Sequence, residues 1–326
     1  MQHEVPSISV VMPVFDARQH LEQSLPPLLA ELGSRVSELI VVDDGSGDGS
    51  AEFAAELGAR VLPSGGTRLG PGRARNVGSK SASGDVLLFV DADVVLAADA
   101  LERIAREFED VETTALYGSY DTNPPHPGFG SQYMNLRHHH VHRVPTRDSG
   151  TFWAGIGAVR RDAFEALGGY DADAYPWPSI EDIELGMRLR QAGGRIRRVP
   201  EIRGTHLKVW SLREVVRVDI TRRALPWSRL MLANPGAFED LNVAGAERGK
   251  ALLAAAFLAS LVLAPFPFAP LWLPAALFAV ACFANRGLFQ LFRQTNGTWF
   301  ALRGLFFHQL YYVYGATAYV YCKLIP

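Results

Sequence analysis

Residues 84–93 (GDVLLFVDAD) constrain the fold of this chain more than any other segment. Their apolar run of valine, leucine and phenylalanine is typical of a buried parallel strand. Asp91 and Asp93 follow the run directly. Because side chains alternate along a strand, the two carboxylates point the same way if the extended geometry continues through them. They are either ligands for a divalent cation that carries phosphates or solvated acids that end the strand.

Strand-like and helical runs alternate along the chain before this segment. The strands are expected at residues 7–14, 38–42 and 60–62, and the helices at residues 18–32, 51–57 and 73–83. This alternation predicts an α/β fold with a doubly wound, mostly parallel sheet. Such sheets bind ligands at the carboxyl ends of their strands, so Phe15, Asp44 and the two aspartates are expected to meet there.

The composition limits the kinds of partner. With 326 residues the chain has room for one large α/β domain and an appendage. A net charge of −2 argues against a nucleic-acid partner. Cys282 and Cys322 are the only cysteines, which excludes a disulfide framework and fits a reducing compartment. The first residues are expected to form a strand, not a signal peptide.

The C-terminal quarter has a different composition. Residues 251–284 contain no charged side chain, and a second apolar and aromatic run covers residues 304–322. These lengths match bilayer-spanning helices, and the proline-rich turn near residue 267 predicts a helical hairpin of residues 251–266 and 269–285. We therefore expect about three transmembrane spans. The alternative is an apolar hairpin packed in a soluble core.

Basic residues flank the hairpin, whereas its turn has none. Arg248 and Lys250 precede it, and Arg286, Arg293 and Arg303 follow it. By the positive-inside rule, residues 1–250 and 286–303 face the cytoplasm, which predicts a multi-pass protein of the cell (inner) membrane.

Two common nucleotide-binding signatures are missing from the sequence. A dinucleotide oxidoreductase places G-x-G-x-x-G directly after its first strand, but here that strand ends in Met-Pro-Val-Phe-Asp. No Gly-Lys-Ser/Thr of a P-loop occurs either. An oxidoreductase or P-loop enzyme is therefore disfavoured.

Six short motifs occur in a specific order: MPVFD at 12–16, VVDDGS at 41–46, GRARNVG at 72–78, DAD at 91–93, GGYD at 168–171 and IED at 180–182. Each motif is weak alone, but together they are specific. Over residues 7–230 the chain resembles the inverting family 2 glycosyltransferases of GT-A fold. That group includes polyprenyl-phosphate sugar synthases, cellulose-synthase-like enzymes and ceramide glucosyltransferase-like enzymes.

The resemblance implies a nucleotide-sugar donor site with Mg²⁺ or Mn²⁺ as cofactor. Asp91 and Asp93 would bind the metal ion, which neutralises the leaving diphosphate. Asp43 and Asp44 also suit the capping of a helix, a purely structural role. The residues expected to contact the donor are Pro13, Phe15, Asp44, Arg68, Arg75, Asn76, Asp91, Arg222 and Arg223.

The resemblance also implies an acceptor site. Asp182 would be the catalytic base that removes a proton from the acceptor hydroxyl. Its alternative role is a capping box with Ser179. Glu181, Gly155 and Trp227 are expected to face the acceptor. Pro226 departs from the Q/R-x-x-R-W motif of the cellulose and ceramide branch, where a second arginine would stand. The arginines before it could instead attract anionic lipid head groups.

The sequence thus predicts a catalytic domain at residues 1–235, an amphipathic linker at 236–250 and transmembrane helices at 251–326. We expect a metal-dependent inverting glycosyltransferase that moves a sugar to a membrane lipid or lipid-linked acceptor. One alternative is a polyprenyl-phosphate sugar synthase, whose phosphate acceptor needs no base. Another is a non-catalytic membrane subunit that binds sugar nucleotides.

Overall fold

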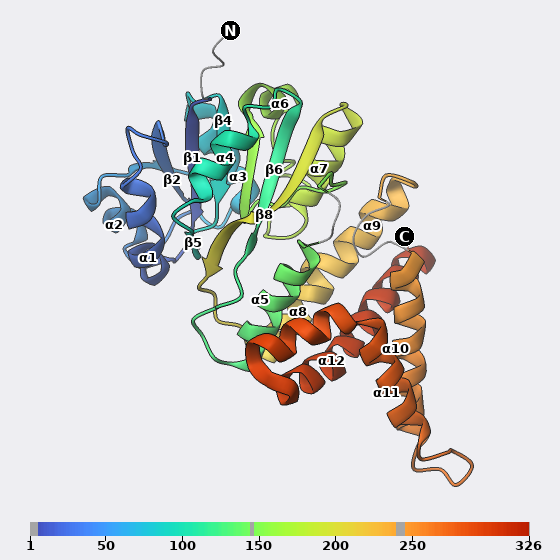
Figure 1. The fold of residues 1–326 in the computed structure, drawn as a ribbon. Helices are drawn as coiled ribbons and strands as arrows, with labels where there is room; N and C mark the ends of the chain where they lie inside the picture. The colour runs from blue at the N-terminus through green and yellow to red at the C-terminus, as the bar shows by residue number, and fades with distance from the viewer. Residues whose placement is uncertain (1–5, 144–146, 239–244, 326) are drawn as a thin grey trace. The chain divides into compact units, whose positions relative to one another are not determined.

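The computed structural model describes residues 6–143, 147–238 and 245–325, which divide into two compact units (Figure 1). Unit 1 holds the chain up to Pro127 together with His142–Val209. Unit 2 holds Gly128–Val141 and the chain from Trp210 onward. This division differs from the domain limit predicted at residue 235.

Unit 1 is built on one eight-stranded sheet with the strand order β3-β2-β1-β4-β7-β6-β8-β5. The strands are β1 Ile8–Val14, β2 Glu38–Asp43, β3 Arg60–Pro63, β4 Val86–Val90, β5 Val94–Leu96, β6 Thr113–Tyr120, β7 Ile156–Arg160 and β8 Arg195–His206. The first four strands of this order are parallel, as predicted. The other half is mixed, because β7 runs antiparallel to both of its neighbours and β5 runs antiparallel to β8.

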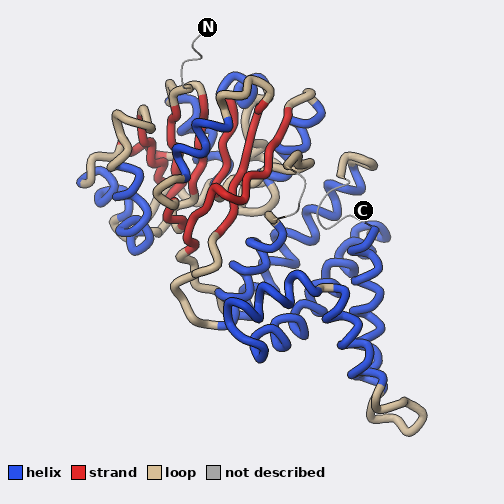
Figure 2. The backbone as a smooth tube through the Cα atoms, in the orientation of Figure 1, coloured by secondary structure: helices blue, strands red, loops and turns tan. Residues whose placement is uncertain are grey.

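Helices cover both faces of this sheet (Figure 2). They are α1 Arg18–Leu29, α2 Ser50–Glu56, α3 Pro71–Ser81, α4 Ala100–Glu107, α6 Arg161–Ala166 and α7 Glu181–Gln191. Alternate residues of the strands feed two separate cores. Val10 and Leu88 pack with residues of α1 and α4, whereas Val11 and Phe89 pack with residues of α3, α6 and α7.

Unit 2 is helical, and its core explains why helix α5 belongs to it. The helices are α5 Phe129–Val141, α8 Leu212–Val218, the π-helix η1 Asp219–Ala224, α9 Leu225–Ala233, α10 Gly245–Leu263, α11 Leu273–Ala284 and α12 Arg286–Leu324. Tyr133 and Leu136 of α5 are buried in one cluster with Phe292 and Leu305 of α12. The predicted hairpin is present as α10 and α11. Residues 239–244 of the predicted linker lie outside the described residues.

A buried ion pair links three helical segments of unit 2. The guanidinium of Arg137 donates to both carboxylate oxygens of Asp219, at 2.6 and 2.8 Å. Arg223 and the hydroxyl of Tyr314 donate to the same carboxylate. Asp219 is only 1% exposed, so these four donors compensate the cost of burying its charge.

The described part of the chain does not show the predicted three transmembrane spans as single helices. Among the described residues, none of the individual helices combines the length and hydropathy of a membrane-crossing segment. Helices α11 and α12 meet these criteria only as a pair, and they are bent by 87° where they join.

The close approach of α3 to the sheet yields a stability prediction. A Cβ at Gly78 would overlap the side chain of Val11 and lie 3.0 Å from Cγ2 of Val42. We expect Gly78→Ala to lower the free energy of unfolding by about 1–3 kcal/mol, although alanine favours helices. Urea unfolding followed by circular dichroism measures this change. Gly47→Ala is the control, because its Cβ would meet no atom within 4 Å. Equal stability of the two variants would contradict the packing.

Candidate active site

The carboxyl ends of three neighbouring parallel strands meet at one edge of the sheet. Strand β1 lies between β2 and β4, and its register pairs Val14 with Asp43 and Val11 with Phe89. Phe15, Asp44 and Asp91 follow these strands, so they lie at the same edge, as predicted.

Asp44 organises the loop that follows β3. Its carboxylate is 5% exposed and accepts hydrogen bonds from the Ser64 hydroxyl at 2.6 Å and from the amides of Leu69 and Gly70 at 3.0 and 2.8 Å. Three of the four lone-pair positions of this carboxylate are therefore used within the protein. Asp43 accepts from the amides two and three residues ahead and so stabilises a turn. It does not cap α2, whose N-cap is Gly49 with no side-chain cap.

The loop held by Asp44 places the guanidinium of Arg68 over the ring of Phe15. The guanidinium carbon of Arg68 lies 4.7 Å from the centroid of the Phe15 ring. Arg68 has a φ of 56°, and its amide donates to the carbonyl of Asp44 at 2.9 Å. Pro13, two residues before Phe15, pairs with Val42 within the sheet. An aromatic face, a guanidinium and a carboxylate thus lie on adjoining segments of one edge.

Arg75 connects the end of β4 to the start of α7. Its side chain is 4% exposed; Nη2 donates to Asp91 Oδ1 at 2.7 Å and Nη1 to Glu181 Oε1 at 3.2 Å. Two carboxylates from distant parts of the sequence are therefore brought to one buried cation. A buried guanidinium pairs well with carboxylates because its donors form a rigid planar fork.

The two aspartates after β4 have different surroundings. Burial raises the pKa of Asp91, and the nearby Arg75 only partly offsets this effect. Burial would also raise the pKa of Asp93, but His206 and Lys208 hold it below its usual value. Asp93 is therefore the more readily ionised of the two.

His206 is a site residue that sequence reasoning missed. Its Nε2 lies 3.5 Å from Oδ2 of Asp93, because β8 pairs with β5 and sets His206 opposite Val94. The imidazole stacks on the ring of Tyr120, with centroids 4.2 Å apart. Only the pairing of two strands far apart in sequence reveals this neighbour.

Asp182 lies in the first turn of α7 and beside the strand ends. Its Oδ2 accepts a hydrogen bond from the amide of Ala154 at 3.1 Å. Burial, and next the charge of Glu181, raise the pKa of Asp182 to about 7. The capping alternative does not hold, because the residue at the N-cap of α7 is Ile180, with no side-chain cap.

Gly155 lies on the main chain between Asp91 and Asp182. It follows Ala154, which binds Asp182, and its own carbonyl accepts from the amide of Asp91 at 3.3 Å. A Cβ at Gly155 would overlap the indole of Trp153. The main chain here thus joins Asp91 to Asp182, and it lies directly before β7.

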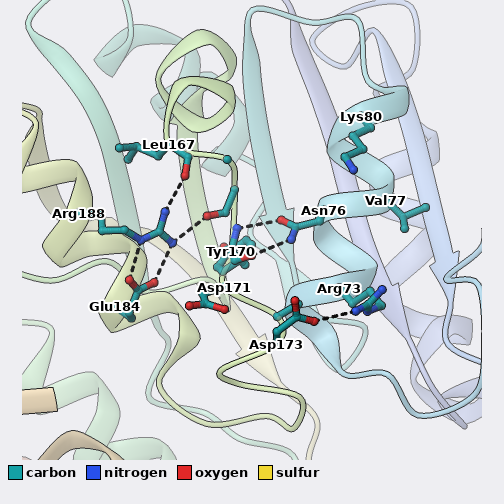
Figure 3. A pocket seen from close by; sticks show the side chains of 13 residues that line it. Arg73, Asn76, Val77, Lys80, Leu167, Tyr170, Asp171, Asp173, Glu184 and Arg188 are labelled. Carbon is teal, nitrogen blue, oxygen red and sulfur yellow. Dashed lines mark hydrogen bonds and ion pairs between the residues drawn. The ribbon is translucent and has the colours of Figure 1, made fainter. Parts of the chain in front are cut away.

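Asn76 contacts the main chain of Tyr170, and its predicted contact with the donor stays a prediction. Its amide oxygen accepts from the amide of Tyr170 at 2.9 Å, and its nitrogen donates to the carbonyl of Tyr170 at 2.8 Å. Figure 3 shows this clamp beside a hollow of about 460 Å³. Arg73 lines the same hollow and pairs with Asp173. Neighbouring residues of a helix point about 100° apart, so Asn76 faces a different side of α3 from Arg75.

Three predicted residues belong to unit 2. Arg223 donates to Asp219 at 2.9 Å, within the network described above. Arg222 lies in the same π-helix, and Trp227 lies in α9. Their contacts with donor or acceptor stay predictions.

The metal assignment to Asp91 and Asp93 likewise stays a prediction. Within residues 6–143, 147–238 and 245–325, there is no group of three or more histidine, cysteine, aspartate or glutamate side chains that could hold a metal ion.

Two family models match this chain. Residues 9–168 match the model described as glycosyl transferase family 2, and residues 137–209 match the one described as N-terminal domain of galactosyltransferase. The first match contains the strand ends, and the second contains Glu181, Asp182 and His206.

Three curated relatives share parts of the sequence. The chain is 39% identical over 106 residues to an uncharacterized glycosyltransferase of Haemophilus influenzae, and 38% over 110 residues to 4,4'-diaponeurosporenoate glycosyltransferase of Staphylococcus haemolyticus. It is 31% identical over 240 residues to polypeptide N-acetylgalactosaminyltransferase 8 of Drosophila melanogaster. These matches cover 30%, 31% and 63% of this chain. They span 41%, 28% and 38% of the relatives, which is less than half of each.

Solved structures with a TM-score of 0.51 share the fold. Mannosyltransferase PcManGT from Pyrobaculum calidifontis is 18% identical and covers 98% of this chain and 88% of its own. Staphylococcus aureus TarS (residues 1–349) is 16% identical, with 98% and 91% covered. Glucosyl-3-phosphoglycerate synthase from Mycobacterium tuberculosis is 19% identical, with 70% and 78% covered. Residues 9–168 are therefore similar to glycosyltransferase family 2, and the chain shares the GT-A-like fold of these solved structures.

Proposed function

We propose that the protein is an inverting glycosyltransferase that moves a sugar from a nucleotide-sugar donor to a membrane lipid or lipid-linked acceptor. One observation carries this proposal: Arg75 and the main chain around Gly155 hold Asp91, Glu181 and Asp182 together at the edge of the sheet. Ligands of α/β sheets bind at such an edge.

The nucleotide would lie against Phe15, Arg68 and Asp44. The ring of Phe15 offers a stacking face for a base, and Asp44 has one lone-pair position left for a base N–H. Two of the similar structures are complexes with a nucleotide sugar and Mn²⁺: the Pyrobaculum mannosyltransferase with GDP-Man and the mycobacterial synthase with UDP-Glc. These complexes support a nucleotide-sugar donor.

Asp93 and His206 fit a divalent cation better than Asp91 does. Their nearest donor atoms are 3.5 Å apart, a carboxylate suits Mn²⁺ or Mg²⁺, and a neutral imidazole is a common metal ligand. Asp91, in contrast, is engaged by Arg75. When bound, Mn²⁺ or Mg²⁺ would neutralise negative charge on the departing diphosphate. Of the two aspartates predicted to bind the metal ion, we therefore propose Asp93 as the ligand, with His206 beside it.

Asp182 would act as the base. As the acceptor oxygen attacks the anomeric carbon, its proton passes to the Asp182 carboxylate and the nucleoside diphosphate leaves from the opposite face. A pKa of about 7 suits this task, since the carboxylate is then half ionised at neutral pH and still basic. Glu181 would orient the site through Arg75.

The membrane part of the proposal rests on unit 2. Residues 251–284 are uncharged, and basic residues flank them, so we place the protein at the cell membrane with its catalytic unit on the cytoplasmic face. A lipid acceptor would then reach the site from the bilayer. A phosphate acceptor, as in a polyprenyl-phosphate sugar synthase, and a non-catalytic binding subunit are the alternatives.

Substitution of the base separates these alternatives. We expect Asp182→Asn to lower kcat by about 10²–10⁴-fold with little change in donor affinity, because proton removal is lost and the shape is kept. Sugar transfer and calorimetric donor binding measure the two effects. Near-full activity would favour a phosphate acceptor, and an inactive wild type that still binds donor would indicate a binding subunit.

The pH dependence of the reaction tests the same group. The protonated form of Asp182 is inactive, so we expect log kcat/KM to rise about one unit per pH unit below 7 and to level off above it. Initial rates between pH 5 and 9 measure the profile. Residual activity of Asp182→Asn should lack this limb. A wild-type profile already flat at pH 5 would contradict the raised pKa.

Metal removal tests the cation. We expect a chelator to abolish hydrolysis of nucleotide sugars and added Mn²⁺ to restore it, with Asp93→Asn and His206→Asn each needing at least about tenfold more Mn²⁺. Asp173→Asn is the matched control, because that carboxylate is 91% exposed and pairs with Arg73 beside the hollow. Full activity of the wild type in chelator would refute the metal role.

A further inference from the structure

We propose that α10 and α11 form a re-entrant membrane anchor. In this arrangement the hairpin enters the bilayer from the side of Lys250 and Arg286 and returns to that side, while its turn stays within the hydrocarbon. The proposal rests on the membrane location in the proposed function and replaces the expected spans with a different topology. Five features of unit 2 support it.

The surface of the hairpin is apolar where a soluble protein would be polar. The side chains of its turn, residues 264–272 (APFPFAPLW), have no charged or hydrogen-bonding group except the indole of Trp272. Phe268, Leu271 and Trp272 are 74%, 79% and 67% exposed. Contiguous apolar surface of this kind marks contact with a membrane or a protein. The absence of any charge across residues 251–284 favours lipid as the occupant.

The arms are too short for a comfortable crossing. The uncharged part of α10, residues 251–263, is about 20 Å long, and α11 is about 18 Å long at 1.5 Å per residue. The hydrocarbon core is about 30 Å thick. A turn that emerged on the far side would need polar residues to meet water, and this turn provides none of them in its middle.

The main chain of the turn is adapted to a place without water. Pro265, Pro267 and Pro270 have no N–H group. Five amides donate to main-chain carbonyls within the hairpin. The pairs are Ala264 to Ser260, Phe266 to Leu263, Ala269 to Phe266, Leu273 to Pro270 and Ala276 to Trp272. Of the six N–H groups in residues 264–272, three donate to main-chain carbonyls in this way. The prolines and these three bonds together reduce the number of N–H groups that need water, which lowers the cost of placing the turn in hydrocarbon.

Both ends of the hairpin are held at one polar level. The hydroxyl of Tyr312 contacts Asn285 Oδ1 at 2.8 Å and Glu247 Oε2 at 3.1 Å, and Lys250 pairs with Glu247 at 2.6 Å. Asn285 ends α11 and Glu247 begins α10. These polar groups define the level at which the two arms enter and leave the hydrocarbon.

The next helix turns away at this level. α12 begins at Arg286, and the 87° bend against α11 directs it across the hairpin, not along it (Figure 1). The helix is kinked at Gly297, which has a φ of 83°. Arg286, Arg293 and Arg303 suit contact with anionic head groups. The near-perpendicular direction of α12 against α11 is the one expected of an interfacial helix beside an inserted hairpin.

Thiol labelling of the full chain in sealed vesicles tests the topology. Phe268→Cys and Gly249→Cys are made in a background with Cys282→Ala and Cys322→Ala, and the vesicles contain phosphatidylethanolamine and phosphatidylglycerol. A Cβ at Gly249 would meet no atom within 4 Å, so this variant is the matched control at the base. A membrane-impermeant maleimide is added outside or trapped inside, and protease digestion of unit 1 identifies the molecules that face outward.

We expect Gly249→Cys to be labelled from the side of unit 1, and Phe268→Cys from neither side until detergent is added. Labelling of Phe268→Cys from the opposite side would show a spanning hairpin and overturn the re-entrant proposal while leaving the proposed function intact. Labelling from the side of unit 1 would place the turn in water or on a protein and overturn the anchor. Failure of the protein to associate with vesicles would refute the membrane location itself, and nucleotide-sugar hydrolysis in solution would still report on the enzyme.

A charge at the turn provides a second measurement. We expect Phe268→Glu to weaken retention in floated vesicles by about a hundredfold, because a charge resists transfer into hydrocarbon. Val111→Glu is the control, since Val111 is a 67% exposed apolar residue of unit 1. Donor hydrolysis should stay unchanged in both variants. Equal retention of the two variants would contradict a lipid-embedded turn.

Discussion

The structure of unit 1 depends on the ion pairs that the guanidinium of Arg75 forms. Arg75 comes from α3, is almost fully buried, and pairs with Asp91 at the end of β4 and Glu181 at the start of α7. A buried cation requires such partners, and removal of one of them from a buried pair typically costs about 3–5 kcal/mol. The pairing fixes the start of α7, and therefore the position of Asp182, relative to the strand that carries Asp91 and Asp93. The proposed base and the proposed donor corner are thus parts of one electrostatic unit, not two sites that happen to be near each other.

Much of this edge of the sheet could be predicted from local sequence. The alternation of strands and helices sets the parallel order of β1, β2, β3 and β4, and parallel strands bring Phe15, Asp44 and Asp91 to one edge without further information. The antiparallel half could not be predicted in this way, because β7 inserts between β4 and β6 through pairings that no local pattern specifies. His206 was missed for the same reason, since only the pairing of β8 with β5 brings it to Asp93. The contact of Asn76 with Tyr170 could not be predicted either, because motif membership does not determine which face of α3 a residue occupies.

The two units use charge in opposite ways. Unit 1 buries charged side chains in pairs to build a polar edge. Unit 2 contains such a cluster around Asp219, and it also carries Glu247, Lys250 and Arg286 at the base of an uncharged hairpin. This base belongs to the same helical core as α5, which explains why the chain divides at Trp210 and why α5 leaves unit 1. The proposed acceptor at a lipid surface rests on this helical unit.

Transfer of labelled sugar into membrane lipid tests the central claim most directly. The purified full chain is incubated with Mn²⁺, a panel of radiolabelled nucleotide sugars and a membrane lipid extract, and the lipid fraction is analysed by mass spectrometry. The account predicts one donor whose sugar appears in a glycolipid, with the anomeric configuration inverted and the yield dependent on Asp182. Release of free sugar alone across the whole panel, or a glycolipid that retains the configuration of the donor, would contradict it.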